Sequence, residues 1–339
     1  MKFGPVAVAQ SLGGIVAHSV RRDDFVLKKG EVVAARHIDA LQAAGVAEVI
    51  VAQMEPGDIG ENATAQALAR RVAGPGLRLE APFTGRCNLF AAAAGVLVLE
   101  PAAIDAINAV DERVTLATLP AMRSVVEGEM VATVKIIPFA VAQAVLDRVL
   151  EVARPGTIRV AAYRPLRIGV ISTLLAGLKA SVIAKTLRVL EARLAPMGAK
   201  ISGHAEVAHE IAALAGAVAA MAGTCDLMII FGASAITDRR DVIPAAIVAA
   251  GGAVDYFGMP VDPGNLLLLA RLADGRPVLG APGCARSPKE NGFDFVLQRL
   301  VAGVAVTGRD ISQMGAGGLL MEIVSRPQPR AGSEAVGHG

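Results

Sequence analysis

The sequence has no tryptophan and few aromatic residues of any kind, since Phe, Trp and Tyr together make up 3% of its 339 residues. Proteins that hold single-stranded nucleic acid stack bases on aromatic side chains and follow the backbone with a basic groove. The formal net charge here is only +2, and the Lys and Arg residues form no basic stripe. We therefore expect no nucleic-acid partner.

Cysteine is also scarce. The three cysteines, Cys87, Cys225 and Cys284, are odd in number and widely spaced, so they predict neither a disulfide framework nor a zinc site. The spacing of His204 and His209 matches no metal-binding motif. This cysteine usage is typical of a reducing compartment, and we expect a cytoplasmic protein.

Long hydrophobic runs are missing, although hydrophobic residues make up 53% of the chain. No stretch of about 18 apolar residues is free of charge, Gly and Pro, so the sequence predicts no transmembrane helix and no membrane partner. The N-terminal MKFGPVAVAQSLGG lacks the pattern of a secretory signal. The apolar excess is mostly Ala and Val, as in α/β proteins with buried sheets.

The character of the sequence changes near Ala153-Arg154. Residues 1–153 mix short strand-like and helical patterns, which predicts an N-terminal α+β region. Residues 154–330 alternate strands and helices regularly, which predicts an α/β domain with a doubly wound, mostly parallel sheet in three layers. The small, polar tail 331–339 is predicted to be disordered.

Three loops of the second region follow predicted strands: STLLAGLKAS, FGASAITDRRD and GAPGCARSPKENG. Ligands of open α/β sheets bind at the carboxyl ends of the strands, where the strand order reverses. We therefore expect the ligand site at these loops. A pair of strands is predicted around the turn Asp274-Gly275, and Asn291 is predicted to cap the last helix.

The loop FGASAITDRRD combines small residues with hydroxyls and charges. The small turn Gly232–Ala235 allows close approach of an anion to backbone N–H groups, and the next helix offers its N-terminus. Thr237 adds a hydroxyl, and Arg240 can clamp a phosphate. An alternative stays open, in which Asp241 caps the helix and the other charges pair on the surface.

The loop GAPGCARSPKENG is similar in kind, because Gly283 gives a compact turn and Arg286, Ser287 and Lys289 can contact an anion. The alternative is an ordinary loop before a capped helix. No histidine lies near Cys284 in the sequence, which favours a buried or partly buried thiol over a nucleophile. The turn at Asp262-Pro263-Gly264-Asn265 is equally compatible with a simple strand connection.

These segments resemble the molybdopterin-binding domain of molybdenum-cofactor biosynthesis proteins, which include molybdopterin adenylyltransferases and molybdenumtransferases. The family has small residues and a hydroxyl after a strand and then an Arg-Asp-Val helix start; the counterparts here are Gly232, Ala233, Ser234, Arg240, Asp241 and Val242. Pro263-Gly264 is similar to the family's proline-glycine turn, and Leu279–Gly283 to its Leu-Pro-Gly-Asn-Pro loop. The resemblance extends over about residues 165–303.

The chain resembles most a bacterial branch with the segments GASAITDRRDVIPAA, GMPVDPGN and GAPGCARSPKENGFD. PFTGRCNLF and ATVKIIPFAV in the first half also resemble this branch, without an assigned chemistry. In that branch a domain similar to molybdenum cofactor cytidylyltransferase often follows, and this chain reaches SRPQPR about where it would begin. A nucleotidyltransferase domain or protein is thus a candidate partner. Relatives form dimers or trimers, so a homo-oligomer is expected.

The resemblance implies a role for each matched residue. The terminal phosphate of molybdopterin would lie on the first loop, and the loop Gly283–Lys289 would close over the pterin or a nucleotide. The implied binding residues are Gly232, Ala233, Ser234, Ala235, Thr237, Arg240, Pro263, Gly264, Gly283, Cys284, Arg286, Ser287 and Lys289. Asp241 and Asp226 match acidic positions used for substrate or Mg²⁺, which makes both candidate catalytic residues and Asp241 the candidate metal ligand.

Three departures from the family pattern favour one hypothesis about function over the others. STLLAG lacks the acidic pair of the metal-inserting members, Ala233 replaces a glycine and Cys284 an asparagine. Because phosphate capture uses mainly backbone groups, these departures favour a molybdopterin-binding or delivery protein. The alternatives are an active nucleotidyl- or molybdenumtransferase, a pyrophosphate-handling protein of the competence-damage type, and a non-binding assembly module.

Overall fold

The computed structural model describes residues 1–22, 25–177 and 179–320. The chain divides into two compact units, one from Met1 to Tyr163 and one from Arg164 onward. The predicted boundary at Ala153-Arg154 lies before a strand, Ile158–Ala162, that pairs within the first unit. The predicted tail 331–339 lies outside the described residues. No helix in the described part of the chain has the length and apolar character needed to cross a membrane.

The first unit combines short helices with strands whose ladders are antiparallel. Its strands are β1 (Lys2–Ala7), β2 (Ile15–Val16), β3 (Val20–Arg22), β4 (Phe25–Leu27), β5 (Glu48–Gln53), β6 (Asp58–Gly60), β7 (Leu77–Leu79), β8 (Arg86–Ala91), β9 (Gly95–Leu99), β10 (Val114–Thr118), β11 (Ser124–Val125), β12 (Met130–Ile136), β13 (Ala140–Ala142) and β14 (Ile158–Ala162). Its helices are α1 (Ala35–Ala43), α2 (Glu61–Val72), α3 (Pro101–Asn108) and α4 (Gln143–Val152), with a 3-10 turn at Val8–Gln10.

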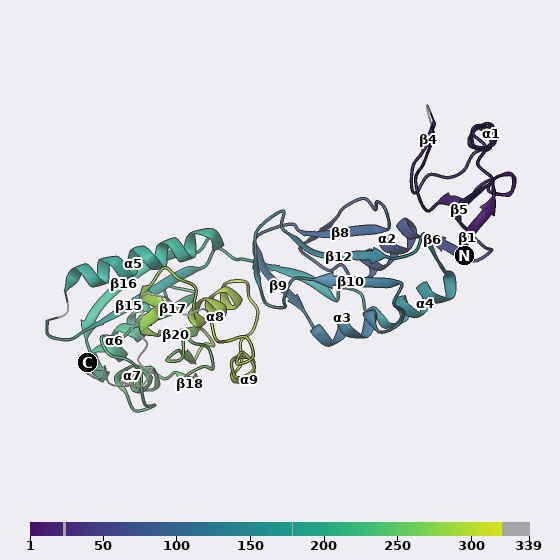
Figure 1. Cartoon of the computed structure of the whole chain (residues 1–339). Coiled ribbons are helices and arrows are strands. Elements are labelled where there is room, and N and C mark those ends of the chain that lie inside the picture. The colour runs from purple at the N-terminus through teal and green to yellow at the C-terminus, as the bar shows by residue number, and fades with distance from the viewer. Residues whose placement is uncertain (23–24, 178, 321–339) are drawn as a thin grey trace, which may run out of the picture. The chain divides into compact units, whose positions relative to one another are not determined.

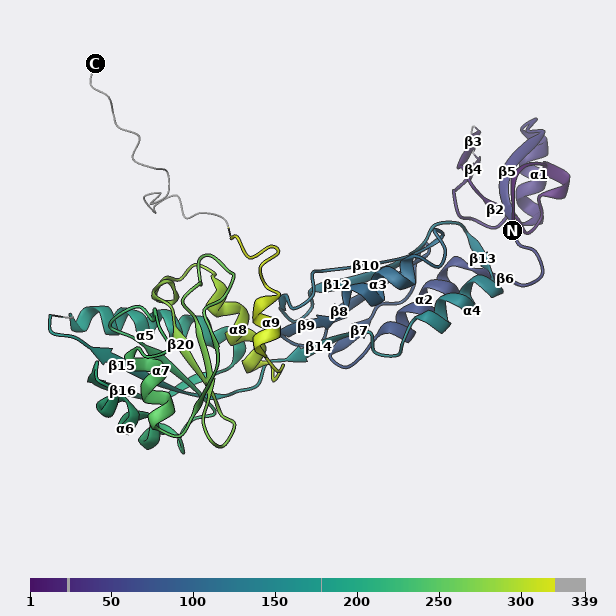
Figure 2. The same cartoon turned by 90° about the horizontal axis from the view of Figure 1, so that it is seen from below.

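The main core of this unit lies between α2 and the sheet β10-β12-β8-β7. Leu68 and Val72 of α2 are fully buried, as are Leu89 of β8 and Val134 of β12. They repeat at helical spacing on α2 and alternate on the strands, so each element buries one face. The helix α4 lies beside α2 (Figure 2), and α3 contacts α4. A second, smaller core joins the sheet β1-β5-β2 to α1.

The second unit contains one sheet with the order β16-β15-β17-β20-β19-β18. Its strands are β15 (Arg167–Leu174), β16 (Lys200–Ala208), β17 (Leu227–Phe231), β18 (Ala253–Phe257), β19 (Leu268–Arg271) and β20 (Pro277–Ala281). Its helices are α5 (Ala180–Leu194), α6 (Ile211–Met221), α7 (Val242–Ala249), α8 (Gly292–Val301) and α9 (Gly308–Ser312), with 3-10 turns at Ala195–Met197 and η3 (Gly283–Arg286).

The ladders between β16, β15, β17 and β20 are parallel, and those between β20, β19 and β18 are antiparallel. The strand pair predicted around Asp274-Gly275 is thus confirmed as β19 and β20. All five residues of β17 are buried, as expected for a strand covered on both faces. In Figure 1, α5 lies on one side of the sheet and α6 and α7 on the other. The unit is a mixed α/β structure around a multi-stranded sheet.

Candidate functional site

The carboxyl ends of β15, β17 and β20 meet at one edge of the sheet. Ser172 of β15 is in register with Phe231 of β17, which is in register with Ala281 of β20. From β15 the chain continues to β16 on one side and returns to β17 on the other. The strand order therefore reverses between β15 and β17, which is where open α/β sheets bind ligands. The loops 232–241 and 282–291 both leave from this edge.

The turn after β17 is tight and tied to β15. The Ala233 N–H donates a hydrogen bond of 2.8 Å to Oγ1 of buried Thr173, which also lies 2.8 Å from Nδ1 of His209. A Cβ atom on Gly232 would lie 2.6 Å from the carbonyl oxygen of Ser234. The Ala233 N–H is therefore engaged within the protein, whereas Ser234 and Ala235 are exposed at the edge. The roles of Thr173 and His209 in this turn had no signal in the sequence.

This close approach predicts that Gly232 cannot be replaced without cost. We expect Gly232→Ala to lower the free energy of unfolding by about 1–3 kcal/mol, because the added methyl group must displace backbone. Gly283→Ala is the matched control, since a Cβ there would meet no atom within 4 Å; its effect should stay within about 0.5 kcal/mol. Denaturant unfolding of both variants measures the difference, and equal effects would contradict the packing described.

Asp241 is the N-cap residue of α7, but its side chain points back to the preceding loop. Its Oδ2 accepts hydrogen bonds from the Thr237 and Asp238 N–H groups, the latter at 2.9 Å, and from Thr237 Oγ1 at 3.1 Å. These bonds, from Thr237 first, hold the pKa of Asp241 below its usual value. Among the described residues no three His, Cys, Asp or Glu side chains group together as a metal site would require. Asp241 therefore shapes the loop.

Arg240 is engaged on the surface. Its Nε donates to Oδ1 of Asp238 at 2.7 Å and its Nη2 to Oδ2 at 3.2 Å, while its side chain is 90% exposed. The pair lowers the pKa of Asp238. This is the surface pairing that the sequence left open as an alternative, and it takes the guanidinium away from the turn Gly232–Ala235.

Asp226 lies at the opposite edge of the sheet from these loops. It precedes β17, and its carboxylate accepts hydrogen bonds from the Arg167 backbone N–H at 2.8 Å and from Nη2 at 2.9 Å. Arg167 is the first residue of β15, so both residues mark the amino ends of their strands. Asp226 therefore lies away from the carboxyl-end loops and joins two neighbouring strands through Arg167, and its candidate catalytic role stays a prediction.

The same pair gives a prediction on pH. The hydrogen bonds from Arg167 lower the pKa of Asp226 from 3.8 to about 2. Because the pKa of Asp226 is lower in the folded protein than in the unfolded chain, the ionised pair stabilises the folded state at pH values above the unfolded-state pKa. This stabilisation is lost as the pH falls toward 2. Carboxyl titration by NMR should show this pKa, and Arg167→Gln should return it to the ordinary range. An ordinary pKa in the unchanged protein would contradict the pairing.

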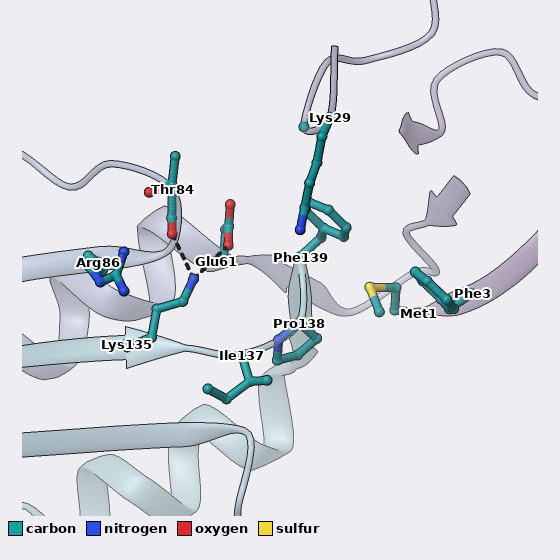
Figure 3. Close-up of a pocket in the computed structure, with 11 residues that line it drawn as sticks. Met1, Phe3, Lys29, Glu61, Thr84, Arg86, Lys135, Ile137, Pro138 and Phe139 are labelled. Carbon is teal, nitrogen blue, oxygen red and sulfur yellow. Dashed lines mark hydrogen bonds and ion pairs between the residues drawn. The ribbon is translucent and has the colours of Figure 1, made fainter. Parts of the chain in front are cut away.

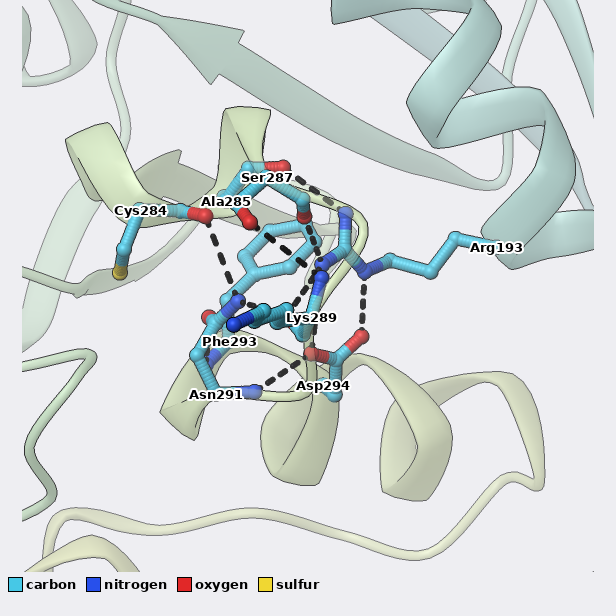
Figure 4. Close-up of polar contacts among 8 residues, drawn as sticks. All are labelled: Arg193, Cys284, Ala285, Ser287, Lys289, Asn291, Phe293 and Asp294. Carbon is cyan, nitrogen blue, oxygen red and sulfur yellow. Dashed lines mark hydrogen bonds and ion pairs between the residues drawn. The ribbon is translucent and has the colours of Figure 1, made fainter. Parts of the chain in front are cut away.

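The loop after β20 is held by a buried arginine from α5 (Figure 4). Arg193 donates to the carbonyl oxygens of Ala285 at 2.8 Å, Ser287 at 2.7 Å and Lys289 at 3.2 Å, and forms an ion pair with Asp294 of α8. The side chains of Arg193 and Asp294 are only 9% and 6% exposed. Nothing in the helical sequence around Arg193 signals this role. The loop is thus fixed by its backbone, and the Lys289 side chain is exposed.

The start of α8 is capped as the sequence predicts. Asn291 Oδ1 accepts from the Phe293 N–H at 3.1 Å, and Asp294 Oδ2 accepts from the Asn291 N–H at 2.9 Å. The Gly292 N–H donates to the Pro263 carbonyl oxygen at 2.8 Å. A Cβ on Gly264 would lie 2.8 Å from the Gly292 Cα. Pro263 and Gly264 are therefore buried and pack against the helix start, and their role in ligand binding stays a prediction.

Arg286 connects the two loops. Its Nη2 donates to the Gly232 carbonyl oxygen at 3.0 Å and its Nη1 to Oγ1 of Thr186 at 2.7 Å, and its guanidinium lies 5.2 Å from the centre of the Phe231 ring. It forms no ion pair with any described carboxylate, and burial lowers its pKa. A half-buried cation without an acidic partner at the carboxyl ends of the strands is suited to an anion. Cys284, two residues earlier in the chain, is half-buried.

Comparison with known proteins gives limited matches. A family model described as a domain of unknown function, DUF8806, matches residues 5–53. No curated protein matches the sequence. A molybdopterin biosynthesis MoeA protein from Pyrococcus horikosii is 12% identical with a TM-score of 0.31, covering 91% of this chain and 76% of that one.

A molybdenum cofactor biosynthesis protein from Pyrococcus furiosus is 11% identical with a TM-score of 0.26, covering 90% of this chain and 66% of that one. TM-scores this low do not establish a shared fold.

Proposed function

We propose that the chain is a molybdopterin-binding protein of molybdenum-cofactor biosynthesis. It would hold the terminal phosphate of the pterin at the carboxyl ends of β15, β17 and β20, and its second unit would have the three-layer doubly wound arrangement of that domain family. The observation that carries the proposal is Arg286, a half-buried guanidinium without an acidic partner among the described residues. Molybdopterin is inferred as the ligand from the sequence resemblance over about residues 165–303.

The contacts divide the candidate residues into those free for a ligand and those engaged within the protein. Arg286 uses two of its nitrogens on Gly232 and Thr186 and keeps further N–H groups for phosphate. Ser234 and Ala235 follow Gly232, whose carbonyl oxygen Arg286 contacts, and both residues are exposed. Thr237 and Arg240 are bonded to aspartates of their own loop. We therefore expect the phosphate on Arg286, Ser234 and Ala235.

Binding or delivery is favoured over transfer chemistry by the state of Asp241. Its Oδ2 is occupied by loop N–H groups, and among the described residues no three His, Cys, Asp or Glu side chains group together here. The described residues therefore form no cluster of metal ligands at Asp241, and we derive no step through Mg²⁺. A nucleotidyl- or molybdenumtransferase is the second hypothesis, with nucleotide and metal supplied by another domain or protein.

The test is titration of the purified chain with molybdopterin, with and without Mg²⁺ and with CTP or ATP. Saturable binding that requires the terminal phosphate, without pyrophosphate release, is the expected result. Release of pyrophosphate would instead establish a transferase. Absence of binding together with saturable binding of ADP-ribose would replace the proposal by the pyrophosphate-handling alternative. Light scattering on the same samples measures whether the chain is the expected homo-oligomer.

A further inference from the structure

A pocket in the first unit is formed by two sequence segments that the proposed function leaves without a role. They are PFTGRCNLF, which contributes Thr84 and Arg86, and ATVKIIPFAV, which contributes Lys135 and Ile137–Phe139. The cavity has a volume of about 510 Å³ and is completed by residues from the N-terminal part of the same unit (Figure 3). Small-molecule sites usually have volumes of this order.

Positive charge predominates around the cavity. Lys29, Arg86 and Lys135 line it together with a single acid, Glu61. Lys135 Nζ donates to the Thr84 carbonyl oxygen at 2.7 Å and lies 3.6 Å from Glu61 Oε2, so these two charges largely compensate each other. Lys29 and Arg86 form no ion pair with the described residues and are exposed at the pocket. The pocket is therefore suited to an anion.

Apolar side chains form the rest of the lining. Phe3 and Ile137 are 59% and 60% exposed, and Phe139 is half-buried beside Lys29 (Figure 3). Single exposed apolar residues are common and need no explanation. Here they share one concave surface with the unpaired cations, which is the combination found in sites that recognise a ring and a charged group together.

The wall between Glu61 and Lys135 contains a strained residue. Thr84 has a φ of +43°, which is unfavourable for a β-branched side chain. Its carbonyl oxygen is held by Lys135, and the next residue, Gly85, lies so close to β12 that a Cβ would be 2.9 Å from the Ile136 carbonyl oxygen. Such strain persists only where neighbouring contacts enforce it, and it concentrates at ligand-binding sites.

We propose that this pocket is a second ligand site that binds a small aromatic anion, with its phosphate or carboxylate attracted by the lining cations Lys29 and Arg86 and its ring against Phe3 and Phe139. The site does not depend on the molybdopterin site, because it uses other residues in another unit of the chain. The two anionic groups share the same recognition chemistry, and different probes distinguish them.

The experiment is calorimetric titration of the full chain with phenyl phosphate, benzoate and inorganic phosphate. We expect phenyl phosphate or benzoate to bind to the pocket at least about tenfold more tightly than inorganic phosphate, because an aromatic ring also covers the apolar wall. Arg86→Ala and Lys29→Ala should each weaken this binding about tenfold. The controls are Arg159→Ala and Lys28→Ala, which remove exposed cations outside the pocket lining. These two variants should leave the affinity for the aromatic anion unchanged.

Arg286→Gln shows whether the calorimetric signal comes from the pocket in the first unit or from the proposed molybdopterin site. Binding that persists in this variant but is lost in Arg86→Ala and Lys29→Ala belongs to the first unit. Two variants are used because one could perturb folding, which thermal unfolding of each will reveal. The proposal is overturned if neither aromatic anion binds at millimolar concentration, if inorganic phosphate binds equally well, or if only Arg286→Gln removes binding.

Discussion

Arg286→Gln is expected to weaken molybdopterin binding by roughly 100-fold. Hydrogen bonds to a charged group contribute about 1.5–3 kcal/mol, and each 1.4 kcal/mol corresponds to about tenfold in affinity. The half-buried position of Arg286 limits screening by solvent, which places the effect toward the upper part of this range. Equilibrium titration with molybdopterin at two salt concentrations measures the loss.

Arg240→Gln is the matched control. Arg240 belongs to the Arg-Asp-Val segment that resembles the family, but its side chain is 90% exposed and paired with Asp238. We expect a change below about threefold for this variant, because exposed ion pairs contribute little. Arg286→Lys keeps the charge but loses the planar fork, and should lie between the two. A larger loss of molybdopterin affinity for Arg240→Gln than for Arg286→Gln would show that the phosphate binds at the surface of the loop instead.

Arg193→Ala is expected to destabilise the second unit by about 3–5 kcal/mol, the range for breaking a buried ion pair on one side. The substitution leaves the Asp294 carboxylate buried without its cation and removes the donor for three carbonyl oxygens of the loop. Denaturant unfolding measures the loss. Hydrogen exchange of residues 283–294 should rise in the same variant, because α5 no longer holds the loop.

The control for this prediction is Arg271→Ala. Arg271 also pairs with an aspartate, Asp255, but its side chain is 56% exposed, so its loss should cost less than about 1 kcal/mol. The double variant Arg193→Met/Asp294→Leu removes both buried charges and should recover part of the stability lost in Arg193→Ala. Similar losses for Arg193→Ala and Arg271→Ala would show that burial does not set the strength of the pair.

Much of the second unit follows from local sequence pattern. The apolar run before Gly232 predicts the buried strand β17, the turn Asp274-Gly275 predicts the pair β19 and β20, and Asn291 predicts the cap of α8. These features depend on side-chain periodicity, turn propensity and hydrogen bonds within a few residues. Such interactions are encoded in adjacent residues, so the sequence by itself determines them.

The composition of the candidate site was decided by the tertiary structure. Arg193 meets Asp294 across 101 residues of sequence, and Arg286 reaches Gly232 across 54. The same sheet places Asp226 at the edge opposite to the loops that its sequence neighbours form. A polar side chain near a strand end can bind a ligand, pair with a neighbour or cap a helix with the same local sequence. Which of these it does depends on the partner that the fold brings within hydrogen-bond distance, and only long-range packing sets that distance.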